Sequence, residues 1–298
     1  FNVPRGTELT DTRCRDNIRQ QKYIRPKYYR ANDIMQKIFA ITNQKGGVGK
    51  TTTTINLAAS LALADQNVLI VDMDPQANLT SGIGKKGSFR PAGTVYEALT
   101  ADSEPEIAEF IVPTDVAGLS LLPADRNLTG AEVELVSLVQ RERRLRPLLQ
   151  QAKTNFDYVL IDTPPSLGLL TLNALVAAEG MIIPLTCDYF ALEGLAELMT
   201  TLRRVQGAYN PSLEITGVLL TMADNRTNLG QQVTKEVKDF FGDKVFGTRI
   251  PRNIRLAEAP SHGLPVILHD VKSKGAEAYL ALAREFILRG QNSHAGEM

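Results

Sequence analysis

A glycine-rich turn between a strand pattern and a helix pattern constrains this chain more than any other feature. Residues 37–42, before the turn, are apolar and β-branched, as is typical of a buried parallel strand. Residues 51–64, after it, carry apolar side chains at helical spacing. This order puts the N-terminus of a helix, with its free N–H groups and partial positive charge, at the end of a strand, where it can hold an anion.

The turn itself has the composition of a loop that binds nucleotide phosphates. Residues 44–51 read Gln-Lys-Gly-Gly-Val-Gly-Lys-Thr, and the glycines allow the backbone N–H groups to turn onto an anion. Lys50 is placed to reach the terminal phosphates, and the Thr51 hydroxyl to ligate Mg²⁺. A surface turn that binds nothing is the alternative, but it would not explain why Lys50, Thr51 and both flanking elements fit a phosphate site.

Lys45 makes this loop unusual. The common phosphate-loop pattern has a glycine at the position of Gln44, and here a second lysine follows that position. Because Lys45 begins the loop, it can point away from its own phosphates and toward the nucleotide of a partner subunit. Phosphoryl transfer needs such positive charge in the transition state. On residue type alone, a solvated lysine is the competing interpretation.

Further apolar strand patterns alternate with helix patterns and predict an α/β fold, a mostly parallel twisted sheet with helices on both faces. The strand patterns are residues 68–72, 158–162, 181–185 and 215–220, with helix patterns at 192–205, 229–241 and 276–287. Residues 84–118 lack this pattern, and we expect a peripheral helical insertion there. In the basic run 141–146 we expect a solvated helix face.

Acids stand where two of these strands end. Asp162 can hold Mg²⁺ through water, and Asp72 and Asp74 flank Met73 at the end of the other strand. One of the latter pair could serve the metal and the other could orient the attacking water. Capping of the next helix is the alternative for both, but a phosphate loop on an adjacent strand favours a functional role.

Composition limits the remaining possibilities. The net charge is zero, which argues against a polyelectrolyte binder, and the hydrophobic fraction of 43% can supply a sizeable core. No apolar run is long enough to span a membrane. Cys14 and Cys187 have no metal-ligand spacing, so we expect reduced thiols in a cytoplasmic protein. Basic residues outnumber acidic ones in residues 1–37 and 203–255.

Several motifs together resemble the ParA/Soj family of deviant Walker A ATPases, within the wider ParA and MinD superfamily. These motifs lie at residues 45–52, 72–76, 162–175, 189–195, 226–229 and 250–263. The resemblance implies a P-loop ATPase domain over residues 35–290. We expect residues 1–34 to be a disordered basic extension, although the run at 25–30 could instead touch nucleic acid, and residues 291–298 to be a flexible tail.

The family resemblance implies a cycle that partitions DNA. ATP and Mg²⁺ would promote a homodimer in which each Lys45 reaches the other subunit's nucleotide, and this dimer would bind double-stranded DNA without sequence preference. A ParB-type centromere-binding partner would stimulate a weak basal ATPase, and the protein would be cytoplasmic and associated with the nucleoid.

Specific residues can be assigned to that cycle. Catalysis would fall to Lys45, Lys50 and Asp74, metal binding to Thr51, Asp72 and Asp162, and DNA contact to Arg226 and Arg255. The nucleotide would be held by Lys45, Gly46, Gly47, Val48, Gly49, Lys50, Thr51 and Thr52, with Pro251 and Asn253 beside the adenine.

Three other functions compete with this one. A membrane-associated ATPase of the MinD type should carry a C-terminal amphipathic targeting helix, whereas the last helix pattern here is core-like. A carrier of the nitrogenase-iron-protein type needs paired cysteines at its dimer interface, and Cys187 stands alone in the domain. An ATPase that positions other cargo shares the same core and stays open.

Overall fold

The computed structural model describes residues 37–188, 193–223 and 228–295 of the 298-residue chain. It contains a seven-stranded sheet in the order β3-β4-β2-β5-β1-β6-β7, in which only the short edge strand β3 is antiparallel. The strands are β1 (Lys37–Ile41), β2 (Val68–Asp72), β3 (Val112–Pro113), β4 (Leu119–Leu122), β5 (Tyr158–Asp162), β6 (Gly180–Thr186) and β7 (Glu214–Thr221). The predicted fold class is confirmed.

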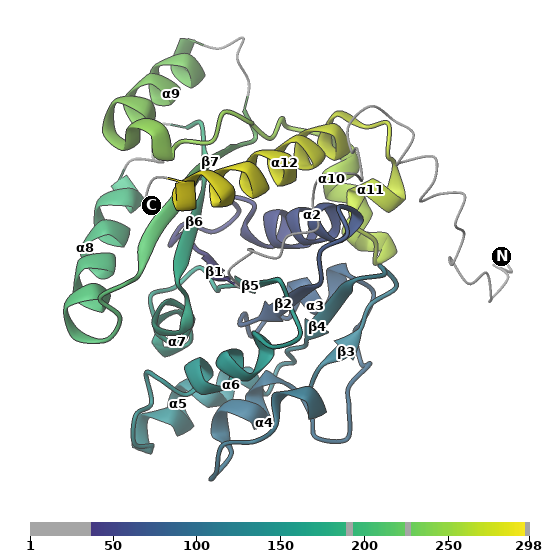
Figure 1. Cartoon of the computed structure of the whole chain (residues 1–298), viewed down its shortest axis with the longest axis vertical. Helices are drawn as coiled ribbons and strands as arrows, with labels where there is room; N and C mark the ends of the chain where they lie inside the picture. Colours follow the sequence, from purple (N-terminus) through teal and green to yellow (C-terminus); the bar gives the residue numbers. More distant parts are fainter. Residues whose placement is uncertain (1–36, 189–192, 224–227, 296–298) are drawn as a thin grey trace, which may run out of the picture.

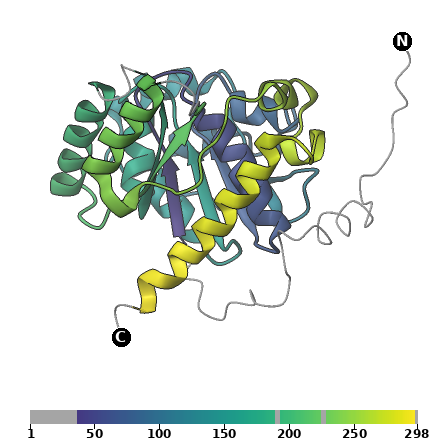
Figure 2. The same cartoon turned by 90° about the horizontal axis from the view of Figure 1, so that it is seen from above.

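Helices cover both faces of this sheet (Figures 1 and 2). One layer holds α2 (Lys50–Leu63), α3 (Asn78–Gly82), α10 (Ile254–Glu258), α11 (Val266–His269) and α12 (Lys274–Ala295). The other holds α4 (Val95–Thr100), α5 (Leu128–Glu134), α6 (Leu145–Ala152), α7 (Leu169–Ala177), α8 (Glu193–Ala208) and α9 (Asn228–Phe241). Single 3₁₀ turns lie at Ile107–Glu109, Leu135–Ser137, Gly242–Lys244 and Ala259–His262.

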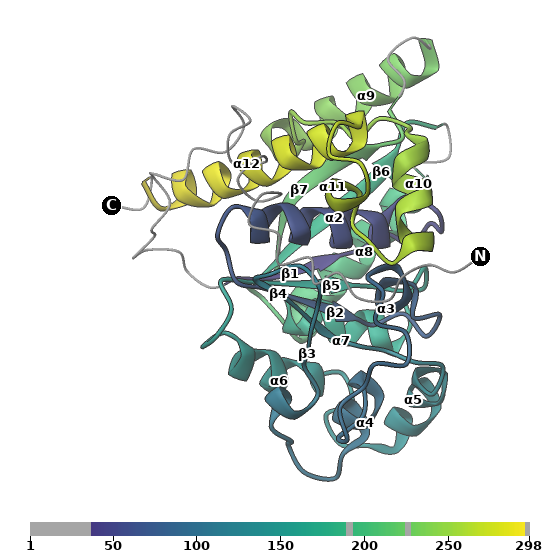
Figure 3. The ribbon, with the colours of Figure 1, turned by 90° about the vertical axis from the view of Figure 1, so that its right-hand side faces the viewer.

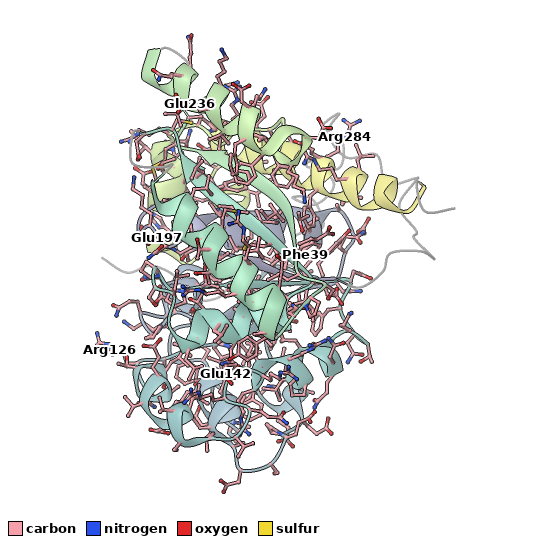
Figure 4. The ribbon with its side chains drawn as sticks, turned by 90° about the vertical axis from the view of Figure 1, so that its left-hand side faces the viewer. Phe39, Arg126, Glu142, Glu197, Glu236 and Arg284 are labelled. Carbon is pink, nitrogen blue, oxygen red and sulfur yellow. The ribbon has the colours of Figure 1, made fainter. Side chains whose placement is uncertain are left out.

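The central strands bury both of their faces because side chains alternate along a strand. In β1, Ile38 and Ala40 pack into the core under α7 and α8, whereas Phe39 and Ile41 pack into the core under α2 and α12. Figure 4 looks onto the layer that contains α7 and α8, with the exposed Glu197 on α8 and Phe39 on the sheet. Phe286 of α12 meets the Phe39 ring edge-on, with the ring centroids 4.9 Å apart.

The region between β2 and β5 differs from its prediction. Residues 84–118 do contain α4 and a 3₁₀ turn, but they also supply β3, and β4 follows them as an unpredicted parallel neighbour of β2. Figure 3 shows α4, α5 and α6 together at one end of the molecule, beyond these strands. No helix in the described residues is long and apolar enough to cross a membrane.

A smaller expectation is also corrected. The basic run at 141–146 is not simply a solvated helix face, because α6 begins only at Leu145. The Arg144 guanidinium instead donates hydrogen bonds to the carbonyl oxygens of Leu99 and Ala101 at the end of α4. At the other end of the chain, α12 extends to Ala295, and the division into a domain at 35–290 and a flexible tail at 291–298 stays a prediction.

Candidate active site

The glycine loop joins β1 to α2 at the carboxyl edge of the sheet, where ligands of such folds bind. Gly47 (φ 73°) and Gly49 (φ 87°) adopt left-handed backbone conformations that other residues seldom tolerate. Gly49 caps α2, and the Thr221 hydroxyl of β7 donates a hydrogen bond to the Val48 carbonyl oxygen over 2.8 Å. The loop is therefore fixed by its own turn and by a strand distant in sequence, with the N-terminus of α2 as its far side.

Lys50, the first residue of α2, is a buried cation. Its side chain is largely enclosed, and its Nζ donates a hydrogen bond to the Lys45 carbonyl oxygen over 3.1 Å. Burial lowers the pKa of Lys50, while the nearby Asp162 and Asp74 carboxylates raise it and only partly offset that effect. An anion bound in the loop would favour the charged form of this lysine, as a phosphate-binding role requires.

Asp162 lies beside the loop at the end of β5. The Thr51 hydroxyl donates to its Oδ2 over 2.7 Å, and the Thr54 hydroxyl to its Oδ1 over 3.3 Å. The carboxyl is fully buried, and burial together with the charge of Asp72 raises its pKa well above the ordinary value. A carboxylate and a hydroxyl are hard oxygen donors of the kind Mg²⁺ prefers, and a cation would stabilise the ionised acid.

Asp72 ends β2 in register with Asp162 of β5, but its hydrogen bonds lead elsewhere. Its Oδ2 accepts from the Thr80 backbone N–H over 2.9 Å and from the Thr80 hydroxyl over 2.7 Å, and its Oδ1 accepts from the Asp74 N–H. Burial raises the pKa of Asp72 to about 6, although the Thr80 hydrogen bonds counteract the shift. These contacts anchor α3, and the role of Asp72 as a metal ligand stays a prediction.

Asp74 is also buried, in the turn between β2 and α3. Its Oδ1 accepts a hydrogen bond from the Gln76 N–H over 2.9 Å. Its charge acts on Lys50, Asp72 and Asp162, so the predicted acids and the loop lysine share one electrostatic environment. The predicted role of Asp74 in orienting water stays a prediction.

Lys45 has a partner that the sequence analysis missed. Its Nζ donates to both carboxylate oxygens of Asp188, over 2.6 and 2.8 Å. Asp188 comes just after the carboxyl end of β6, the strand beside β1, and Asp72 and Asp162 are the last residues of β2 and β5. That common position was the available signal. Thr54, Thr80 and Thr221 gave no comparable signal, because threonines in helices and strands are ordinary.

The remaining predicted residues lie on the segment after β7 and on α10. Pro251 pairs with Ala223, which comes shortly after the loop-anchoring Thr221. The Asn253 side chain accepts a hydrogen bond from the Arg255 N–H and so caps α10. Arg255 is exposed and forms ion pairs with Glu258 and Asp270, over 2.8 and 3.2 Å. Arg226 lies outside the described residues.

Comparison with known proteins agrees with this geometry. The fold and the loop define a P-loop nucleotide-binding protein of the α/β class, and the family model described as AAA domain matches residues 36–215. The chain is 54% identical over 257 residues to the sporulation initiation inhibitor protein Soj of Bacillus subtilis, covering 86% of this chain and all of that protein. It is also 54% identical over 253 residues to the chromosome partitioning protein ParA of Myxococcus xanthus, covering 85% and 88%. The chain belongs to the ParA/Soj family of partitioning ATPases.

Solved structures share the same fold. Cobyrinic acid a,c-diamide synthase from Mycobacterium smegmatis, solved with ADP and magnesium, is 38% identical with a TM-score of 0.74, covering 87% of this chain and 97% of that one. The cell division ATPase MinD of Pyrococcus furiosus is 26% identical with a TM-score of 0.68, covering 84% and 98%.

Proposed function

We propose that this protein hydrolyses ATP to partition DNA. In this proposal, ATP and Mg²⁺ produce a sandwich homodimer that binds double-stranded DNA without sequence preference, and a ParB-type partner stimulates hydrolysis and release. The observation that carries the proposal is the convergence of Lys45, Lys50 and the Thr51–Asp162 pair on one glycine loop. Membership of the ParA/Soj family supports the choice of DNA as cargo over another cargo.

Each residue contributes a separate part of the chemistry. The loop N–H groups and Lys50 would hold the phosphates, while Pro251 and Asn253 would flank the adenine. Asp74 would orient the attacking water, and Lys45 of the partner would neutralise charge that develops during phosphoryl transfer. Hydrolysis would thereby depend on dimer formation, because each site is incomplete without the second subunit.

The Thr51–Asp162 pair is the part of the site that fits Mg²⁺. Its two oxygens lie 2.7 Å apart, and burial of the carboxyl makes a neighbouring cation favourable. When bound, Mg²⁺ would supply positive charge to the β- and γ-phosphate oxygens. Asp72 would support this metal site indirectly, by holding α3 and the turn that carries Asp74.

The experiment for the ATPase part compares the wild type with Lys50→Ala. We expect the variant to lose binding of a labelled ATP analogue and to lose phosphate release, because no other buried cation lies on the described part of the loop. Addition of DNA and a ParB-type protein should accelerate phosphate release by the wild type only. Unchanged affinity of Lys50→Ala for the analogue would refute the phosphate-loop assignment.

The DNA part is tested by gel shift with ATP, ADP and no nucleotide at two salt concentrations. Binding should require ATP and fall steeply with salt, since phosphate contacts release counterions. Arg226→Glu and Arg255→Glu should weaken binding with little loss of ATP affinity. Arg284→Glu, another exposed arginine (Figure 4), is the matched control on α12. Wild-type DNA binding by both Arg226→Glu and Arg255→Glu would refute the proposed surface. Binding to lipid vesicles instead would favour a membrane-positioning ATPase.

A dimer that binds DNA without sequence preference would spread over the chromosome. We therefore expect a cytoplasmic protein that co-localises with the nucleoid in its ATP form. A fluorescent fusion of the Lys50→Ala variant should lose this co-localisation, whereas the wild-type fusion should keep it.

A further inference from the structure

The ion pair between Lys45 and Asp188 connects the loop to the neighbouring strand within one chain. Both carboxylate oxygens of Asp188 accept hydrogen bonds from the Lys45 ammonium group. Oδ2 of Asp188 also accepts a hydrogen bond from the Thr186 hydroxyl over 2.8 Å. The side chains of Lys45 and Asp188 are 34% and 46% exposed. The pair is therefore well oriented, yet open to solvent and to competing anions.

The fold prepares this pair through Asn43. The Asn43 side-chain amide donates to the Pro184 carbonyl oxygen of β6 over 2.7 Å, while its Oδ1 accepts from the Lys45 backbone N–H over 2.9 Å. These bonds fasten the start of the loop to β6, which leads directly into Asp188. The position of Lys45 beside Asp188 thus follows from backbone anchoring as well as from charge attraction.

We propose that Asp188 is a positioning residue that holds Lys45 within its own subunit and releases it only to the nucleotide of a second copy of this chain. The inference rests on the proposed sandwich dimer, in which Lys45 acts on the partner's phosphates. In this proposal the Lys45 ammonium leaves Asp188 when it reaches across to the partner's phosphates, so dimer formation breaks two Lys45–Asp188 pairs. Asp188 is therefore a latch that raises the threshold for dimerisation.

The strength of the pair sets what such a latch can do. An exposed ion pair contributes only a factor of a few to an equilibrium, since water and salt screen it. A triphosphate offers Lys45 more negative charge than one carboxylate, and more than a diphosphate does. The latch therefore yields to ATP. It raises the dimerisation threshold with either nucleotide, so at a given protein concentration it suppresses the weaker ADP dimer without blocking the ATP dimer.

The test measures dimerisation of Asp188→Asn by sedimentation velocity over a protein concentration series with Mg²⁺ and a non-hydrolysable ATP analogue. Because two latches open per dimer, the variant should dimerise at roughly tenfold lower concentration than the wild type. It should also form more dimer with ADP. Asp188→Glu keeps the charge and should restore most of the wild-type threshold.

Two controls separate a latch from a merely structural role. Asp115→Asn removes another Lys–Asp pair, Lys85 with Asp115 at 2.7 Å, and should leave the dimerisation threshold unchanged. In a Lys45→Ala background, Asp188→Asn should have no further effect, because the cycle isolates the coupling between the two residues. Affinity of the monomer for the ATP analogue should not change on Asp188→Asn, whereas a structural anchor of the loop would lower it.

The outcomes distinguish the latch from the function on which it rests. If the wild type dimerises with the analogue and Asp188→Asn does so at the same or a higher concentration, the latch alone is overturned. If analogue affinity of the monomer falls in parallel, Asp188 is a structural anchor and the latch is again overturned. A wild type that stays monomeric at every concentration overturns both the sandwich dimer and the latch.

Discussion

Asp72 and Asp162 end adjacent strands in register, and both are fully buried acids, yet they serve different neighbours. Asp162 accepts hydrogen bonds from the hydroxyls of Thr51 and Thr54 of α2, at the phosphate loop. Asp72 accepts hydrogen bonds from the backbone N–H and the hydroxyl of Thr80 in α3. The Thr80 hydroxyl in turn accepts from the Ala124 N–H just beyond β4, so Asp72 belongs to a network that ties three segments together.

This difference shows that the role of an acid at a strand end depends on the helix that packs over it, because that helix supplies the hydrogen-bond donors. Burial raises the pKa of both carboxyls, because neither ionised group is stabilised by water. Three donated hydrogen bonds offset this cost at Asp72. At Asp162 two hydroxyls do so only in part, which leaves this acid better suited to a cation.

The largest expected effect is the loss of hydrolysis in Asp162→Asn. If Asp162 serves Mg²⁺, phosphate release should fall by on the order of 100-fold or more, since metal stabilisation of the transition state contributes several kcal/mol. The free energy of unfolding should change little, because the substitution removes a carboxyl group whose ionised form is disfavoured by burial. Asp157→Asn alters the acid just before the same strand and is the control for activity. Wild-type phosphate release across a Mg²⁺ titration of Asp162→Asn would contradict the assignment.

Asp72→Ala should show the opposite pattern, with stability affected most. The substitution leaves the Thr80 N–H and hydroxyl without their acceptor, and an unsatisfied buried donor costs about 1–3 kcal/mol. Denaturant unfolding of the nucleotide-free protein measures this loss. Activity losses should track the displacement of α3 and should not depend on Mg²⁺ concentration. A variant as stable as the wild type, with a shifted Mg²⁺ requirement, would make Asp72 a metal ligand.

Thr80→Val tests the same network from its other side. The double-mutant cycle with Asp72→Ala should give a coupling free energy of about 0.5–3 kcal/mol, because the two side chains share hydrogen bonds. The corresponding cycle between Asp162→Asn and Thr80→Val should give a coupling close to zero. Comparable coupling in both cycles would mean that the two acids act as one unit.

The smallest effect concerns Glu285 on α12, an acid whose pKa shifts the other way. Burial raises its pKa, but the N–H groups of Gly247 and Thr248 and the Arg289 guanidinium outweigh burial and hold the pKa below the ordinary value. Such a group stabilises the fold above its unfolded-state pKa, and this contribution is lost as pH falls through the lower folded-state pKa. Glu285→Gln should therefore cost under about 1 kcal/mol at neutral pH after solvent screening, with the difference vanishing in acid. Unfolding curves of both proteins across an acid pH series measure it, and a difference that grows in acid would contradict the assignment.

Much of the fold was predictable because local patterns and tertiary packing agree. The strands at 37–41, 68–72 and 158–162 are apolar apart from one charged residue at an end, Lys37, Asp72 or Asp162, as burial on both faces demands. β4 was missed since its four residues, Leu-Ser-Leu-Leu, give too short a pattern. Its pairing with β2 makes it a strand, and that contact is distant in sequence.

The sequence predicted some features of the site and not others, as it did for the fold. The sequence located the loop and the acids, and the structure brings the loop together with Asp162, Asp72 and Asp74 at one edge of the sheet. It did not indicate that Lys45 would meet Asp188, because the two residues are separated by several elements. Nor did it indicate that the Arg255 side chain pairs with two carboxylates, one of them from the segment after α11.

The sequence by itself determined that this chain has a phosphate loop between a strand and a helix, since glycine, lysine and threonine at fixed spacing impose that chemistry locally. Only the tertiary structure decided which acid faces the loop, which acid secures α3 and which acid holds Lys45. The physical reason is that a carboxylate at a strand end is given its partners by neighbouring strands and helices, and these come from distant parts of the chain.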